Sequence, residues 1–290
     1  MSTSSSDTSG GPIRFVADTE SGGTMTWLLN FDKIINNGMG GTLSERPDLS
    51  GIEAILDLAC GPGGWVLEVA REHPDIKVTG VDISKSMIEF AQAQASSRGY
   101  GNAAFMVADI KQPLPFEAES FDLVNERTIY GVMGPGEWPQ LLAECKRVLR
   151  PGGIIRLTEL EMPVSTSPAL NELCYITTMA IYKTRRTFSV DGWHVGITPV
   201  LQRLLRDAGF QNVKYRGYVM DISAGTPDFE GFWRNFVYVL ELVKPFMLKV
   251  EGLTTEQEYD RLYQKMQAEI LASDFCGLWT YVTAWGEKPR

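Results

Sequence analysis

Short apolar runs recur along the first half of the chain, and segments with a different apolar spacing separate them. The short runs predict buried strands, at residues 55–58, 78–82, 104–107, 121–124 and 154–159. Between them, apolar residues recur every three or four positions, most clearly over residues 66–70 and 138–149, which predicts helices. Strands that alternate with helices in this way predict parallel βαβ units, which bind ligands beyond the carboxyl ends of their strands.

The second half of the chain continues this pattern with a helix and two more strands. Residues 199–208 predict a helix, which Gly209 ends. A strand is expected at residues 212–219. Residues 277–284, where β-branched and aromatic side chains alternate, predict the last strand.

Three further segments lie outside this alternation. Residues 24–44 precede the first strand and have helical apolar spacing, and two long insertions occupy residues 163–192 and 223–273. Most of the aromatic and methionine side chains in the insertions are expected on the buried faces of amphipathic helices. Because long insertions at the ligand edge of a parallel sheet usually cover a site, we also expect them to form a helical lid.

A glycine-rich turn joins the first strand to the first helix of the alternation. It reads Asp-Leu-Ala-Cys-Gly-Pro-Gly-Gly-Trp from Asp57. Glycine lets the backbone bend sharply and approach a ligand closely, and the N–H groups at a helix start favour a polar or anionic group. The third glycine of a dinucleotide-binding fingerprint is replaced by Val66, which argues against a nicotinamide cofactor.

Two acidic residues follow the next two strands. Asp82 ends the second strand, where a carboxylate can accept hydrogen bonds from both hydroxyls of a ribose. Asp109 follows the third strand in the same manner. The alternative for both is a structural one, in which the carboxylate caps the next helix.

Together, the turn and the two acids resemble the class I S-adenosylmethionine (SAM)-dependent methyltransferases of the small-molecule type, over about residues 54–159. The resemblance implies an α/β fold with a doubly wound, Rossmann-like sheet of seven mostly parallel strands. It places the last strand antiparallel, inserted beside the fifth. It also implies SAM as the cofactor and S-adenosylhomocysteine as its product.

Transferred to the matched positions, the resemblance implies a site for the methionine end of SAM. Asp57 and the turn residues Ala59, Gly61 and Gly63 would hold this end. Asn125, at the expected end of the fourth strand, would offer its backbone near the methionine amino group.

The resemblance likewise implies a site for the nucleoside end. Asp82 would bind the ribose, and Ile83 would pack on the adenine. Asp109 would accept a hydrogen bond from the adenine amino group, with Ile110 beside the ring.

Composition narrows the class of partner. The 290 residues carry a formal net charge of −9, and 44% of them are hydrophobic, which suffices for one large domain, expected at residues 24–290. Residues 1–23 are rich in Ser, Thr and Gly and are expected to form a disordered tail. The acidity argues against a nucleic acid partner, because phosphate binding relies on clustered Lys and Arg. No apolar run has the length of a membrane span.

The cysteines indicate a cellular location. Cys60, Cys145, Cys174 and Cys276 have neither metal-binding nor redox spacing. We therefore expect no metal, and reduced thiols, which favour the cytoplasm.

The acceptor of the methyl group is expected to be a small, largely apolar organic molecule, such as a natural product or a lipid-like metabolite. Many aromatic residues in the two insertions suit a closed apolar pocket. Two alternatives stay open from the sequence: an enzyme that uses the SAM pocket for other chemistry, and a non-catalytic SAM-binding protein. Whether oxygen, nitrogen or carbon is methylated, whether a general base takes part, and the oligomeric state also stay open.

Three residues are candidates for catalysis at the expected acceptor site. Tyr130 follows the fourth strand and Glu161 the fifth. His194 lies in a loop between Gly192 and Gly196, and histidine titrates near neutrality, as a general base requires. The alternative for His194 is a structural hydrogen bond in that loop.

Overall fold

A twisted eight-stranded sheet forms the centre of the protein, whose computed structural model describes residues 21–46 and 48–290. The strand order is β3-β2-β1-β4-β5-β8-β6, and β7 pairs with β8. The parallel strands are β1 (Ala54–Leu58), β2 (Lys77–Asp82), β3 (Ala103–Val107), β4 (Phe121–Arg127) and β5 (Leu149–Leu160). β8 (Gly277–Glu287) lies antiparallel between β5 and β7 (Gln211–Asp221).

The expected doubly wound sheet, with its last strand antiparallel beside the fifth, is therefore confirmed. All seven expected strands are present. The eighth, β6 (Val164–Ser165), is a two-residue extension that pairs with the start of β8.

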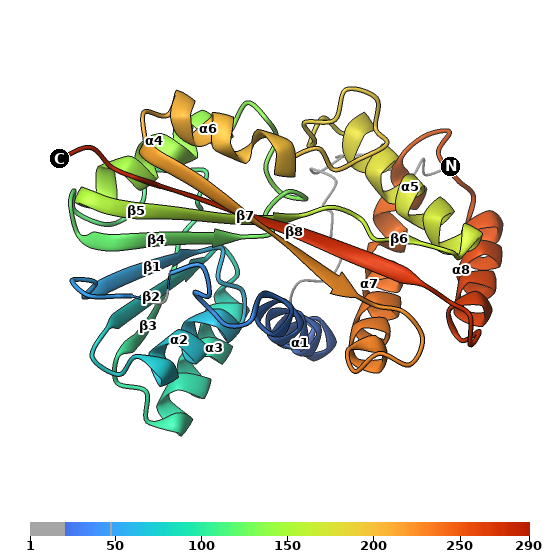
Figure 1. Ribbon diagram of the computed structural model, residues 1–290, viewed down its shortest axis with the longest axis horizontal. Helices are drawn as coiled ribbons and strands as arrows, with labels where there is room; N and C mark the ends of the chain where they lie inside the picture. Colours follow the sequence, from blue (N-terminus) through green and yellow to red (C-terminus); the bar gives the residue numbers. More distant parts are fainter. Residues whose placement is uncertain (1–20, 47) are drawn as a thin grey trace, which may run out of the picture.

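Helices cover both faces of the sheet. On one face lie α2 (Gly64–Glu72) and α3 (Lys85–Arg98), and on the other α4 (Trp138–Val148) and α6 (Leu201–Asp207), which follows the short 3₁₀ helix Thr198–Val200 (Figure 1). Ile55 on β1 and Ile155 on β5 are completely buried between these layers. Burial on both faces explains why these strands are apolar throughout rather than alternating.

Three long helices gather at the end of the sheet toward which the parallel strands run: α5 (Pro168–Lys183), α7 (Phe229–Lys249) and α8 (Glu256–Ile270) (Figure 1). They come from the two expected insertions. Together with Ile35 and Met39 of α1 (Gly22–Met39) and Trp279 of β8, they enclose an apolar cluster of their own. Among the described helices, none is long and apolar enough to cross a membrane.

The structure corrects several expected boundaries. α1 begins at Gly22 rather than residue 24 and ends at Met39 rather than residue 44, because Gly40 adopts a left-handed conformation there (φ 76°). The expected disordered tail lies, except for residues 21–23, outside the described residues. β5 begins at Leu149 rather than residue 154, because the Gly152 N–H donates to Lys288 O (2.9 Å) and the Lys288 N–H donates to Gly153 O (2.8 Å).

Candidate active site

The turn after β1 has the open backbone that its glycines predict. Ala59, Gly61 and Gly63 all have positive φ angles, of 53°, 53° and 80°. At Gly63 a side chain would collide with the ring of Phe105, since a Cβ there would lie 2.6 Å from a ring carbon. Glycine at residue 63 therefore lets the turn pack closely against Phe105, directly before the N-terminus of α2.

Asp82 ties this turn to the end of β2. Its Oδ2 accepts a hydrogen bond from the Gly61 N–H (2.9 Å), and its Oδ1 accepts one from the Ser84 N–H (2.8 Å). Burial raises the pKa of the Asp82 carboxyl, and these backbone hydrogen bonds oppose that rise. The cap of α3 comes from Ser84, whose hydroxyl accepts from the Met87 N–H. Asp82 thus orients the turn and does not cap the helix directly.

A row of buried polar side chains crosses the sheet beneath the turn. The Asn125 amide donates to Asp57 Oδ1 (2.6 Å), and Arg156 donates to Asn125 Oδ1 (2.7 Å). Arg156 in turn forms an ion pair with Glu45. Burial raises the pKa of Asp57 to about 7, a rise that Arg127 and the Asn125 amide oppose.

The structure corrects the position expected for Asn125. β4 continues through Arg127, so Asn125 lies inside the strand ladder between Asp57 of β1 and Arg156 of β5. The strand continues because Glu126 and Arg127 find buried partners and can remain in the sheet. The side chain of Asn125 orients Asp57, and the residues at the ligand edge are Arg127 and Thr128.

Helix α1 closes one side of the turn, a role that its sequence pattern did not predict. Arg127 forms an ion pair with Asp32 and donates to Asn36 Oδ1 (2.8 Å). A small cavity of about 50 Å³ lies between the turn, Arg127, and Leu28 and Phe31 of α1. Asp57 is among the residues that line it. The sequence contains one indication that this helix packs against the rest of the protein, namely the apolar face of residues 24–44. Asp32 lies next to that face.

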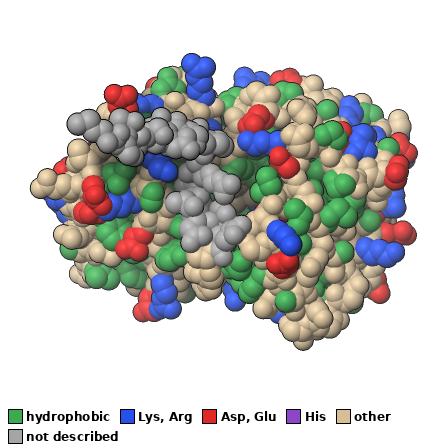
Figure 2. All heavy atoms as spheres, turned by 180° about the vertical axis from the view of Figure 1, so that it is seen from behind, with side chains coloured by type: hydrophobic (Ala, Val, Ile, Leu, Met, Phe, Trp, Pro, Cys, Tyr) green, Lys and Arg blue, Asp and Glu red, His purple; other side chains and the backbone are tan. Residues whose placement is uncertain are grey.

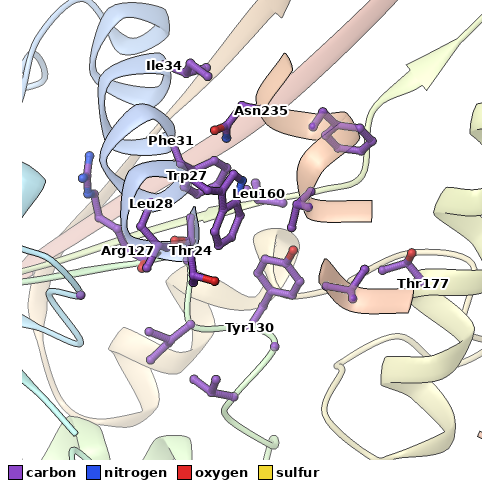
Figure 3. A pocket seen from close by; sticks show the side chains of 18 of the residues that line it. Thr24, Trp27, Leu28, Phe31, Ile34, Arg127, Tyr130, Leu160, Thr177 and Asn235 are labelled. Carbon is purple, nitrogen blue, oxygen red and sulfur yellow. Dashed lines mark hydrogen bonds between the residues drawn. The ribbon is translucent and has the colours of Figure 1, made fainter. Parts of the chain in front are cut away.

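A larger cavity of about 250 Å³ adjoins the turn and extends toward the helices α5, α7 and α8, which we call the helical cap (Figure 3). Its wall at the cofactor end is formed by Ala59, Gly61 and Asp82. Its remaining walls come from α1, the loop after β4, β5, α5, α7 and β8, and their apolar side chains include Trp27, Phe31, Ile129, Leu160, Phe232, Phe236, Leu240, Val243 and Trp279. Ligands held at the turn and in the cap would therefore meet in one continuous space.

Helices α1 and α7 are fastened to each other across this cavity. The Asn235 amide, in the orientation that pairs both its nitrogen and its oxygen, donates to Trp27 O (3.1 Å) and accepts from Trp27 Nε1 (2.9 Å). Asn235 and Trp27 face one another at the cavity wall in Figure 3. Since these polar groups satisfy each other, they add little polarity to the cavity.

Of the three catalytic candidates, the structure brings only Tyr130 to the cavity (Figure 3). Burial, with Glu159 and Glu161 nearby, raises the pKa of its phenol, which therefore stays neutral. Both carboxylate oxygens of Glu161 are occupied: they accept from the Val195 N–H (2.8 Å), and from the Gly196 N–H (3.0 Å) and the Thr198 hydroxyl (2.9 Å).

Glu161 thus holds the loop that carries His194. His194 itself is exposed and does not line the cavity. The hydrogen bonds to Glu161 hold the backbone of this loop at Val195 and Gly196, and the role of His194 itself stays a prediction.

Of the residues expected at the nucleoside end, Asp82 lines this cavity, whereas Ile83, Asp109 and Ile110 do not. Ile83 is exposed (68%), and so is Val107, which pairs with Asp82 across β2 and β3. Asp109 accepts a hydrogen bond from the Lys111 N–H (2.9 Å), and Ile110 is buried. Within the described residues, no group of His, Cys, Asp and Glu side chains is arranged to hold a metal ion.

Comparison with known proteins supports the same class. Residues 55–153 match the family model described as a methyltransferase domain. A demethylmenaquinone methyltransferase of Staphylococcus aureus (strain JH9) is 30% identical over 186 residues, covering 58% of this chain and 72% of that protein. The corresponding protein of Lactococcus lactis is 37% identical over 123 residues, so the chain matches about half of its length (47%).

Solved structures share the fold. Phosphoethanolamine N-methyltransferase 2 of Haemonchus contortus, in complex with SAM, superposes with a TM-score of 0.56 at 20% identity, over 97% of this chain and 61% of that one. YcgJ from Bacillus subtilis superposes with a TM-score of 0.51 at 17% identity, over 88% of this chain and 99% of that one.

The sheet topology, the turn and these matches show that the chain belongs to the class I SAM-dependent methyltransferases. Membership of this class implies SAM as the cofactor, in agreement with the expectation from the sequence.

Proposed function

We propose that this protein transfers the methyl group of SAM to a small, neutral, largely apolar acceptor. The observation that carries the proposal is the continuity of the 250 Å³ cavity, whose wall runs from Gly61 and Asp82 to Phe236 and Trp279. Methyl transfer from a sulfonium is a direct displacement, and holding two reactants in line can contribute ~7–11 kcal/mol to lowering the barrier. The main contribution of the protein to the reaction is thus to position SAM and the acceptor relative to each other.

The residues at the turn fit SAM. The open backbone at Ala59, Gly61 and Gly63 leaves room for the methionine end, and Asp57 would accept from its ammonium group. Asp82 would accept from the ribose hydroxyls, since it already faces the cavity.

At the adenine end, the exposed side chain of Ile83 would pack against the ring, with Ile110 beside it, and Asp109 would accept from the amino group. When bound, the cofactor supplies an electrophilic methyl group.

The charge of the cavity wall supports a neutral acceptor. Among the described residues that line it, the cation is Arg127, and this guanidinium is already paired with Asp32. A phosphorylated acceptor, such as that named for the Haemonchus enzyme, would find no free cation on this part of the wall. An apolar, ring-bearing acceptor of the kind that the name demethylmenaquinone methyltransferase implies suits the aromatic lining better.

Tyr130 is the residue we propose to orient the acceptor. Its neutral phenol can donate a hydrogen bond to an acceptor oxygen. A general base is needed only if the acceptor must lose a proton in the reaction.

The proposal also includes the cellular setting and the absence of nucleic acid partners. The net charge is −9, and on the face shown in Figure 2 the described Lys and Arg side chains are scattered among acidic ones. Cys60, Cys145 and Cys174 are buried thiols, and Cys276 is an exposed one, which suits the reducing cytoplasm.

A labelled-methyl screen tests the function. The purified protein is incubated with SAM carrying a deuterated methyl group and a metabolite extract, and products are sought by the mass gain of one labelled methyl. We expect a neutral, apolar product that is not formed by Asp82→Ala. Calorimetry should show binding of SAM and S-adenosylhomocysteine but not of NAD. Tight SAM binding without any labelled product would favour a non-catalytic role.

A further inference from the structure

Two buried carboxyl groups lie beneath the wall of the acceptor cavity, and nothing in the proposed function uses them. Glu126 on β4 and Glu159 on β5 are both fully buried. One oxygen of each accepts a hydrogen bond from the same backbone N–H, that of Ile129, at 3.2 Å and 3.0 Å. The second oxygen of each, Oε2, has no hydrogen-bond partner among the described groups.

The two side chains lie within hydrogen-bonding reach of each other, so a single shared proton would let one carboxyl donate to the other. Two negative charges held against one N–H in a buried site repel each other, and neither is solvated. A proton on one carboxyl lets it donate to the other, and the pair then carries one charge. Burial raises the pKa of both groups, and for Glu159 the neighbouring Glu126 adds to the rise.

The charged and titratable groups around the pair favour retention of this proton. Asp57 on β1 and Glu161 after β5 raise its pKa values further, and Arg127 on β4 opposes them. Cys145 on α4 and Tyr130 in the loop stay neutral, since burial raises the pKa of both.

The N–H that the pair holds belongs to a strained turn. Thr128 has a φ of 59°, which a β-branched residue rarely adopts. Its N–H donates to Thr158 O (2.9 Å), and the next N–H, that of Ile129, meets the two carboxyls. Residues 128–132 all line the acceptor cavity, and Tyr130 is among them. Glu126 and Glu159 therefore bind a backbone group of this wall, the Ile129 N–H.

We propose that Glu126 and Glu159 share one proton and act as positioning residues, holding the Thr128 turn in the shape that places Tyr130 at the acceptor. The test of this proposal by enzyme activity rests on the proposed methyl transfer, whereas its test by infrared spectroscopy does not. When the shared proton is lost at high pH, the two like charges separate and the wall loosens.

Infrared difference spectroscopy tests the shared proton directly. Spectra at pH 7 of Glu126→Gln and Glu159→Gln are subtracted from the spectrum of the unsubstituted protein, so that the unchanged carboxyls cancel. Each difference should show the loss of one protonated carboxyl band that shifts in heavy water. A glutamine amide can donate to the remaining carboxylate, so both variants are expected to fold. The exposed Glu172→Gln is the matched control and should show no such loss. Two difference spectra without a lost protonated band would overturn the proposal.

The pH profile tests the positioning role. In the unsubstituted protein and in Glu172→Gln, the KM for the acceptor should rise severalfold at high pH. In Glu126→Gln and Glu159→Gln it should stay within about twofold, because an amide donor does not titrate. The same rise in all four proteins would show that the pair does not position the wall. If no acceptor is found, the infrared result still decides on the shared proton, and the missing product counts against the proposed function alone.

Discussion

The polar residues at the ends of β1 and β2 have two tasks, to shape the turn and to bind the ligand. Asp82 accepts from Gly61 and Ser84 with different oxygens, so each oxygen retains acceptor capacity for a ribose hydroxyl. Substitution of Asp82 should therefore affect both the binding of SAM and the stability of the fold.

For Asp82→Ala we expect at least a tenfold loss of SAM affinity, because charge-assisted hydrogen bonds contribute ~1.5–3 kcal/mol. The free energy of unfolding should also fall, by about 1–3 kcal/mol, since the Gly61 and Ser84 N–H groups lose their acceptor. Calorimetric titration and chemical denaturation measure the two effects. Unchanged SAM affinity in a folded variant would mean that Asp82 serves the turn alone.

Asp57 should make both stability and SAM binding depend on pH. Its pKa is raised from 3.8 to about 7, so the protonated form is favoured in the folded state. Its contribution to the free energy of unfolding is complete below 3.8 and is lost as the pH rises through about 7. The ionised form, in contrast, attracts the ammonium group of SAM, so the affinity for SAM should rise over the same range.

Asp57→Asn isolates this group, because an amide oxygen can still accept from Asn125. Its stability relative to the unsubstituted protein should increase between pH 4 and pH 8, as denaturation curves would show. Its SAM affinity should not rise through about pH 7. A parallel pH dependence of the two proteins would exclude Asp57 as the titrating group.

At the scale of elements, helix α1 forms part of the wall of the candidate active site. It contacts the turn through Leu28, lines the acceptor cavity with Trp27 and Phe31, and reaches β4 through Asp32. Since Arg127 is buried and paired with Asp32, this ion pair fixes the helix over the small cavity at the turn.

Asp32→Ala should lower the free energy of unfolding by about 3–5 kcal/mol, because it leaves a buried guanidinium without its counter-charge. The double variant Asp32→Ala with Arg127→Met should recover part of this loss, since it removes the uncompensated charge. Both should weaken SAM binding, which calorimetry can measure. If the double variant were less stable than Asp32→Ala, the remaining contacts of Arg127, such as its hydrogen bond to Asn36, would outweigh the cost of its unpaired charge.

The boundaries of elements show where sequence patterns are least informative. Apolar periodicity placed the end of β4 at Val124, before Asn125, Glu126 and Arg127. The strand continues because these three polar side chains are hydrogen-bonded inside the sheet or at its edge. Burial with a partner cannot be recognised in one segment when the partner lies in another.

At the scale of the whole molecule, the protein consists of a sheet that holds the cofactor turn and a helical cap that holds the acceptor cavity. α1 and β8 join the two parts: Ile35 and Met39, with Trp279 and Tyr281, pack into the cap cluster. Ligands bound at both ends of the cavity should therefore stabilise α1 more than the outer helix α8.

Hydrogen exchange can test this coupling. Addition of S-adenosylhomocysteine should increase protection of the amides of α1 (Gly22–Met39), because Leu28 and Phe31 line the cavity at the turn. The amides of α8 (Glu256–Ile270) should change little, since this helix lines neither cavity. Equal protection of α1 and α8 would indicate a general stabilisation of the fold, without a specific role for α1.

The sequence by itself determined where the seven main strands lie along the chain, the turn at Asp57–Gly63 and the acids that follow the next strands. Each of these is a local property, because periodicity and glycine conformation depend on neighbouring residues. Tertiary structure alone decided the partners of Arg127 and Glu126, the position of Tyr130 at the cavity, and the exposure of His194. Asp32 is 95 residues from Arg127 in the chain, and Glu159 is 30 residues from Ile129. Such pairs form only when packing excludes water, because each buried polar group must then find its partners within the protein.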